Sequence, residues 1–174
     1  LPLACAGSFT NSKLPDAQAM PESAMSMLSA IHCGANFLLH AAGFLDGLLS
    51  MSYDKFMLDE DFCGSLHRYL QGVQVDDESL ALDAWKDIEP GGHFLGSSHT
   101  MRHYKTAFWE SRVADRAPFE TWVEQGEVSS MQRANQRWKK VLKDYQPPEM
   151  DPAIDEALVS FVVRRKGEMK DQWH

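Results

Sequence analysis

The chain has 174 residues, a formal net charge of −8 and a hydrophobic content of 44%. A single domain of this length can bury about 70% of the surface that its unfolded chain exposes. The negative charge argues against a nucleic-acid partner, because phosphate binding needs a basic surface. No apolar run reaches the ~20 residues that a membrane-spanning helix needs. The three cysteines are widely spaced, so we expect reduced thiols and a cytoplasmic protein.

Two apolar segments near the N-terminus each end in small and polar residues. Residues 1–5 lead into Gly7 and a polar loop, and residues 36–39 lead into His40 and an Ala-Ala-Gly sequence. The residues between them carry apolar side chains at helical spacing, which predicts a strand–helix–strand unit. Because parallel strands end at the same edge of a sheet, we expect His40 and the loop after Gly7 to share one opening.

The rest of the chain is predicted to be mostly helical, from the spacing of its apolar residues. Helices are expected over residues 17–34, 52–69, 76–86, 97–108, 119–126, 129–145 and 151–166. A third strand is placed at residues 93–96, after a Pro-Gly-Gly turn. This order predicts an α/β fold. Since two or three parallel strands cannot bury both faces of a sheet, we expect the chain to be the C-terminal piece of a longer protein.

His40 is the strongest candidate for a chemical role. An imidazole at a strand end can donate a hydrogen bond to an anionic substrate or exchange a proton near neutral pH. A structural histidine bonded to a neighbouring carbonyl fits the same pattern.

The loop after the first strand carries a cluster of polar side chains. Thr10, Asn11 and Ser12 could line a pocket, whereas Lys13 and Asp16 could simply pair at the start of a helix, with Asp16 as its cap.

Two further features, a histidine pair and a single aspartate, have open interpretations. His99 and His103 lie at i, i+4, which is a metal-chelating spacing, but no third ligand is evident nearby and His93 could join only through the loop. A metal hydrolase is therefore a distant hypothesis, and hydrogen bonding or substrate contact is the more common role. Asp59 falls on the apolar stripe of its helix, so it lies either near solvent or buried with a partner.

The stretch from Gly7 to Ala19, GSFTNSKLPDAQA, resembles the G-x-x-T-D-S-K-x-P-D-A-Q-A stretch of the trimethylamine methyltransferase family. Similar blocks follow in the same order at residues 36–47, 52–56, 90–103 and 132–135. The resemblance implies the C-terminal part of a TIM (β/α)8 barrel. Residues 1–112 would hold the last βα units, and residues 113–174 a helical region packed on the barrel.

The resemblance also implies a reaction. These enzymes move a methyl group from a tertiary or quaternary amine to the cobalt of a corrinoid carried by a separate protein. A corrinoid protein and a small methylated amine would therefore be the partners, with no cofactor bound directly by this chain. A fragment alone would be inactive, and its exposed strand edges would favour a homo-oligomer.

Site roles follow by analogy with the family. His40 would be the catalytic residue that contacts the substrate, and Phe44 would offer an aromatic face to the cation. The other expected substrate contacts are Thr10, Asn11, Ser12, His93 and His99. The glycines expected to leave room for the flat corrin are Gly7, Gly43 and Gly47.

Two departures from the family pattern bear on the substrate. Asn11 stands where the family usually has Asp, which removes a negative charge from the expected pocket. Ordinary residues occupy positions 7–9, near which methylamine-type members carry pyrrolysine, and this favours the non-pyrrolysine branch that acts on quaternary amines such as glycine betaine. The alternative is a non-catalytic α/β module that docks a corrinoid protein or another subunit.

Overall fold

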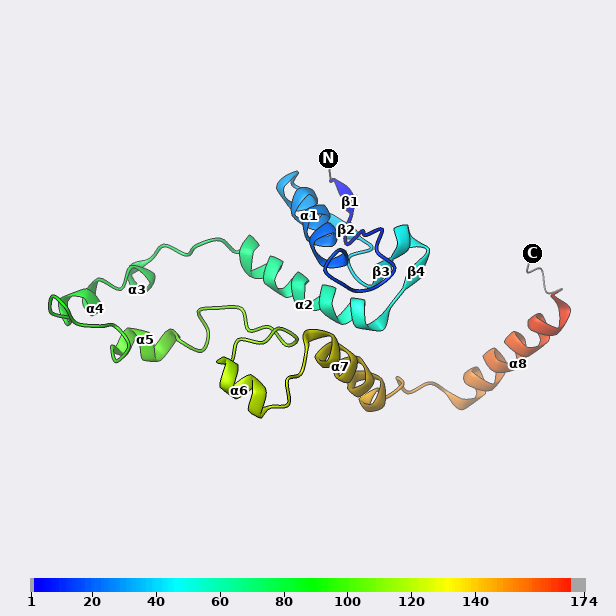
Figure 1. The fold of residues 1–174 in the computed structure, drawn as a ribbon. Helices are drawn as coiled ribbons and strands as arrows, with labels where there is room; N and C mark the ends of the chain where they lie inside the picture. Colours follow the sequence, from blue (N-terminus) through cyan, green and yellow to red (C-terminus); the bar gives the residue numbers. More distant parts are fainter. Residues whose placement is uncertain (1, 170–174) are drawn as a thin grey trace. The chain divides into compact units, whose positions relative to one another are not determined.

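The computed structural model describes residues 2–169, which fall into two compact units, residues 2–141 and residues 142–169. The elements in chain order (Figure 1) are β1 (Ala4–Ala6), α1 (Ala19–His32), β2 (Phe37–Leu39), β3 (Phe44–Leu45), the 3₁₀ turn η1 (Asp46–Leu48), β4 (Ser50–Met51), α2 (Tyr53–Leu70), α3 (Asp77–Leu80), α4 (Leu82–Lys86), α5 (Ser98–His103), α6 (Phe119–Glu124), α7 (Ser130–Asp144) and α8 (Pro152–Glu168). Across the described residues, no helix is both long and apolar enough to cross a membrane.

The strands β1 and β2 pair in parallel and are joined by α1, as the sequence predicts. The hydrogen-bond ladder continues past both strand ends: Gly7 N donates to Leu39 O at 2.7 Å, and Ser8 N donates to His40 O at 3.0 Å. The loops that leave β1 and β2 therefore start side by side. This mixture of helices with a parallel strand pair agrees with the predicted α/β class.

A second strand pair, β3 and β4, forms an antiparallel hairpin that the sequence analysis missed. Its strands have two residues each, so they are too short to show a period-2 pattern. The turn between them needs positive φ angles at Asp46, Gly47 and Leu48 (50°, 59° and 76°). Only one of these is a glycine, which is why the turn carries a weak sequence signal.

Three predictions for the middle of the chain are wrong. Residues 93–96 form a turn rather than a third strand. The helix predicted over residues 76–86 is divided into α3 and α4, because Ala81 adopts the left-handed conformation with φ 52°. The following helix, α5, ends at His103 rather than near residue 108. Short helices gain little from packing and end where local backbone geometry dictates.

In the first unit, α2 packs against residues of α7 and of the loop that precedes α6. Leu58, Val113 and Ala134 form the buried cluster between them. The carboxylate of Asp54, in the first turn of α2, accepts hydrogen bonds from Asn135 Nδ2 (3.0 Å) and Trp138 Nε1 (2.8 Å). Ala134 and Asn135 belong to the family-like block 132–135, so two members of that block serve helix packing.

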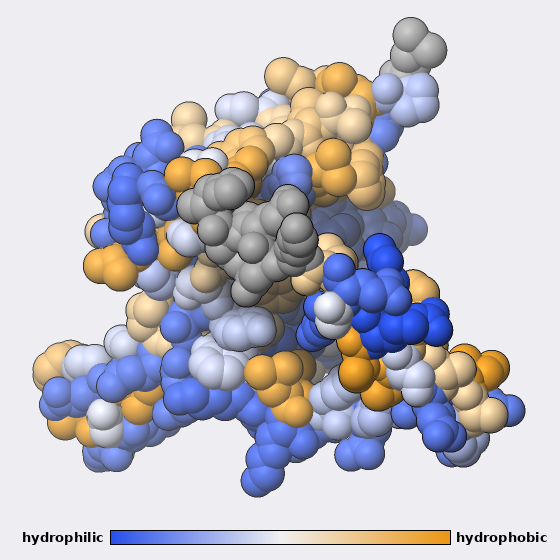
Figure 2. All heavy atoms as spheres, turned by 90° about the vertical axis from the view of Figure 1, so that its right-hand side faces the viewer, coloured by the Kyte–Doolittle hydropathy of each residue, from blue (hydrophilic) through white to orange (hydrophobic). Residues whose placement is uncertain are grey.

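Many large apolar side chains reach the surface, where they appear as orange spheres among the blue in Figure 2. Leu49, Val73, Leu95 and Phe108 are between 76% and 90% exposed. Exposed apolar area on this scale commonly marks contact surfaces for other protein.

Candidate functional site

Three aromatic rings gather where β1 and β2 end. The ring of His40 lies 6.1 Å from that of Phe9 and 5.1 Å from that of Phe44, centroid to centroid, and meets Phe44 edge-on. His40 follows β2 directly, is exposed, and has a φ of 54° that turns the chain out of the strand. Among the described residues, no hydrogen bond reaches its imidazole. Its ring is therefore available to a ligand at this strand edge.

A shallow hollow of about 440 Å³ lies next to this aromatic group. It is lined by Phe9, Thr10, Asn11, Glu22, Gly47 and Leu48. The Glu22 carboxylate accepts hydrogen bonds from Thr10 Oγ1 at 2.7 Å and from Asn11 N at 2.9 Å. These bonds, with the one from Thr10 contributing most, lower the pKa of Glu22 and keep it ionised. The hollow thus combines an aromatic face with a fixed negative charge.

Glu22 is a site residue that the sequence analysis missed. It lies in the first turn of α1, where an acidic residue normally serves the helix dipole, so its position carried no separate signal.

Ser12, by contrast, serves the start of α1. It is buried, and its Oγ donates to Asp16 Oδ1 at 2.9 Å. Asp16 in turn accepts the backbone N–H groups of Gln18 and Ala19, both at 3.0 Å, and these bonds, that from Ala19 first, lower the pKa of Asp16. Lys13 pairs with Asp46 at 3.0 Å rather than with Asp16. The structural interpretation of this part of the loop is therefore right for Asp16 and wrong for the partner of Lys13.

A buried polar network lies beneath the strand ends. Its four side chains, Ser8, Ser23, Lys55 and Asp59, are all 0% exposed. Lys55 Nζ contacts both Asp59 carboxylate oxygens at 2.6 Å and the hydroxyls of Ser8 and Ser23 at 2.9 Å. Asp59 Oδ2 also accepts from Ser8 Oγ at 2.8 Å and from Gly43 N at 2.9 Å. Of the two alternatives for Asp59, the buried carboxylate with a partner is correct.

This network fixes the position of the aromatic group. Ser8 precedes Phe9, and Gly43 precedes Phe44, so the two loops that carry the aromatic residues are both bonded to Asp59. Charges this deeply buried are tolerated only when other polar groups satisfy them, as they are here. The sequence signal was partial: Asp59 stood out on its apolar stripe, with Lys55 one helical turn before it, but nothing indicated the two serines.

The three glycines expected near the corrinoid have different surroundings. Gly7 and Gly43 are buried, and a Cβ at Gly7 would lie 2.9 Å from the Ala41 Cα atom. Close backbone packing therefore explains the glycine at position 7. Gly47 is exposed and has a φ of 59°. A Cβ added at Gly47 would lie 3.5 Å from its nearest neighbour, Asn11 Oδ1. Of the three, Gly47 alone lies on the open rim of the hollow.

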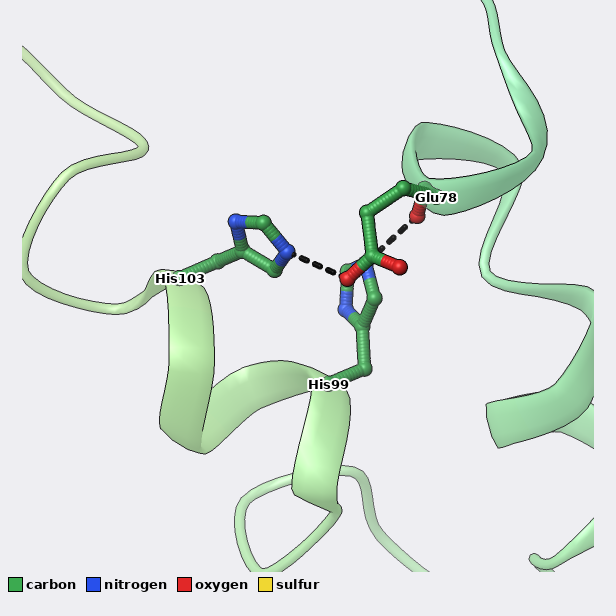
Figure 3. A group of neighbouring side chains, drawn as sticks. All are labelled: Glu78, His99 and His103. Carbon is green, nitrogen blue, oxygen red and sulfur yellow. Dashed lines mark hydrogen bonds and ion pairs between the residues drawn. The ribbon is translucent and has the colours of Figure 1, made fainter.

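The histidines of α5 belong to a separate cluster (Figure 3). His103 Nε2 lies 2.7 Å from Glu78 Oε1, and His99 Nε2 lies 2.7 Å from the backbone oxygen of Glu78. Arg102 donates to Glu78 Oε1 from Nε and Nη2, at 3.1 and 2.8 Å. The hydrogen bond from His103 and then those from Arg102 lower the pKa of Glu78 to about 2.

The structure brings a third potential ligand, Glu78, close to His99 and His103. One ligand atom from each of Glu78, His99 and His103 can be chosen so that all lie within 4.8 Å of one another. Glu78 lies 21 residues before His99, and at this separation sequence spacing does not indicate that the two residues are close in the fold. His93 is exposed and is not a member of this group.

The fold and the strand-end site together define a class. A parallel strand pair whose carboxyl ends open onto an aromatic-lined hollow is typical of α/β proteins that bind small ligands at that edge. Residues 1–170 match the sequence model of the family described as trimethylamine methyltransferase. The chain belongs to this family of methyltransferases.

Individual relatives agree with this assignment. The chain is 37% identical over 99% of its length to a glycine betaine methyltransferase from Desulfitobacterium hafniense, of which it covers 36%. It is 31% identical over 97% of its length to a trimethylamine methyltransferase from the same species, of which it covers 34%. A trimethylamine methyltransferase from Methanosarcina barkeri is 28% identical over 93% of the chain. The chain spans about a third of the length of the curated relatives that it matches.

Proposed function

We propose that this chain forms part of the substrate site of a methyltransferase that moves a methyl group from a quaternary amine to a corrinoid on a separate protein. Family membership supports the transferase class. Greater identity with a glycine betaine methyltransferase than with the trimethylamine enzymes compared here supports a quaternary amine.

The observation that carries the proposal is the aromatic group at the strand ends. A quaternary ammonium has no N–H to donate, so aromatic faces and nearby negative charge are the means of recognising it, at about 0.5–2 kcal/mol for each aromatic contact. Phe9 and Phe44 supply the faces, and the ionised Glu22 lies on the same hollow as Phe9. His40, whose ring lies near both phenylalanine rings, would donate a hydrogen bond to the carboxylate of a betaine.

The corrinoid would supply the cobalt nucleophile that accepts the methyl group, which leaves positioning and electrostatics to the protein. The exposed rim fits the approach of a flat, largely apolar ring. Gly47 has no side chain there, and the neighbouring Leu48 and Leu49 are 38% and 85% exposed. Thr10 and Asn11, through Glu22, would hold the amine beside this rim.

We further propose that β1 and β2 are two strands of a (β/α)8 barrel. Parallel sheets are normally covered on both faces. In β2, Phe37 is 60% exposed and Leu39 is 47% exposed, which is compatible with further strands and helices packing against this strand pair.

The test is methyl transfer from glycine betaine, carnitine and trimethylamine, using the full-length gene product with a Co(I) corrinoid protein and following the change in corrinoid absorbance. His40→Ala should lower the rate at least ~10²-fold if the imidazole orients the substrate. The matched control is His67→Ala, at an exposed position near the end of α2, which should leave the rate unchanged.

Near-normal turnover by His40→Ala would remove this residue from the site. Binding of the corrinoid protein without demethylation of any amine would instead support the alternative of a docking module.

A further inference from the structure

We propose that Glu78, His99 and His103 form a binding site for a divalent transition metal, with Zn²⁺ as the fitting ion, that links α3 to α5. This inference is independent of the methyl-transfer proposal, because it concerns a cluster that shares no residue with the hollow at the strand ends.

The geometry supplies three ligands from two helices. His99 and His103 lie one turn apart on α5, with ring centroids 4.6 Å apart, and Glu78 reaches them from α3 (Figure 3). Ligand atoms of a tetrahedral zinc site lie about 3.3 Å apart, given metal–ligand bonds of about 2.0–2.1 Å. The three side chains already have ligand atoms within 4.8 Å of one another, which is close to that spacing.

The Glu78 carboxylate has one oxygen to spare. Both bonds from Arg102 and the bond from His103 end on Oε1. Within the described part of the chain, Oε2 accepts no hydrogen bond, so it can bind a metal while Arg102 holds the carboxylate in place. Hydrogen bonds to the outer atoms of metal ligands commonly orient those ligands in this way.

The donor set selects the kind of ion. Two imidazoles and one carboxylate are a common ligand set for Zn²⁺, and three protein ligands leave a fourth position for water. Mg²⁺ and Ca²⁺ prefer sites made only of oxygen ligands, so neither fits two histidines. Glu78 is exposed and both histidines are partly exposed, so an ion can enter from solvent.

A bound ion would strengthen a lightly packed part of the structure. The helices α3 and α5 have four and six residues, and each is too short to be stable alone. Ala84 is buried nearby, but Leu82, Trp85 and Met101 remain 58–65% exposed. A metal bound by α3 and α5 together would therefore favour the folded arrangement of this segment.

Calorimetric titration of the metal-free, untagged chain with Zn²⁺ tests the proposal. We expect one ion for each chain, at least a tenfold loss of affinity in Glu78→Gln and in His103→Ala, and unchanged affinity in the control His93→Ala. Co²⁺ in place of Zn²⁺ should give the visible absorption bands of a tetrahedral site, and Mg²⁺ should not bind. Circular dichroism of each variant would show that its fold is kept.

Three outcomes would overturn the site. They are the absence of stoichiometric Zn²⁺ binding, equal affinity in Glu78→Gln and the unaltered chain, and an octahedral Co²⁺ spectrum.

Discussion

The strand-end region and the α3–α5 segment both contain acidic side chains paired with basic ones, but the two groups differ in burial. Lys55 and Asp59 are 0% exposed, and they form hydrogen bonds with Ser8, Ser23 and a backbone amide. Glu78 and Arg102 have side chains that are 53% and 55% exposed, and the carboxylate keeps one oxygen free. The buried Lys55–Asp59 pair therefore holds two loops in place, whereas the exposed Glu78–Arg102 pair keeps a carboxylate oxygen that a ligand can reach.

The energetic reason is the cost of taking charge out of water. Removing one member of a buried pair leaves the other without solvent or partner, whereas an exposed partner is rehydrated at once. Substitutions in the buried pair should therefore lower the stability of the fold strongly, and added salt should have little effect on that pair. Substitutions in the exposed pair should have a small effect on stability, and added salt should weaken that pair.

The largest effect is expected from Lys55→Ala, which leaves the Asp59 carboxylate buried without its cation. The free energy of unfolding should fall by about 3–5 kcal/mol, measured by urea denaturation followed by circular dichroism. Lys13→Ala is the matched control, because its ion pair with Asp46 is exposed, and it should cost less than about 1 kcal/mol. Equal losses in the two variants would show that burial does not distinguish these pairs.

A smaller effect is expected from Gly7→Ala, since the new Cβ would lie 2.9 Å from Ala41 Cα and 3.0 Å from Leu39 O. Backbone atoms cannot rotate away, so we expect a loss of about 1–3 kcal/mol and displacement of the loop that carries Phe9. Gly96→Ala, where nothing lies within 4 Å of the added atom, is the control. The same denaturation measurement checks both, and a neutral Gly7→Ala would contradict the close packing of the two loops.

The smallest effect concerns the pH dependence of the α3–α5 segment. The folded pKa of Glu78 is about 2, below its ordinary value of 4.5, because His103 and Arg102 stabilise the carboxylate. A depressed acid pKa stabilises the fold fully above the ordinary value, and this contribution is lost as pH falls from about 4.5 to about 2. In metal-free buffer, the difference in stability between the unaltered chain and Glu78→Gln should shrink across that range, as followed by thermal melts. A difference that stays constant would rule out the ion pair.

Local patterns in the sequence identified much of the scaffold. The parallel strands β1 and β2 with α1 between them, the Ser129–Gln132 capping box and the cap by Asp151 on α8 all follow from spacing and short-range chemistry. The β3–β4 hairpin and the break at Ala81 were missed, because positive φ angles at non-glycine residues leave little trace in a sequence.

The candidate site was predictable in part. The position of His40 at a strand end followed from one apolar run, and the family blocks pointed to the same edge. Glu22, Lys55 and the two buried serines were not foreseen as site or supporting residues, since their partners lie on other elements. The roles of His40, His93 and His99 toward a substrate stay predictions.

By itself, the sequence determined the β1–α1–β2 unit and the family, and it indicated a strand edge as the candidate site. Tertiary structure alone decided which polar side chains meet: Asp59 with Ser8, 51 positions away, and His103 with Glu78, 25 positions away. Periodicity and capping report contacts within a few residues along the chain, whereas these pairings depend on how separate elements pack. Packing also determined burial, which distinguishes the buried Lys55–Asp59 pair from the exposed Glu78–Arg102 pair.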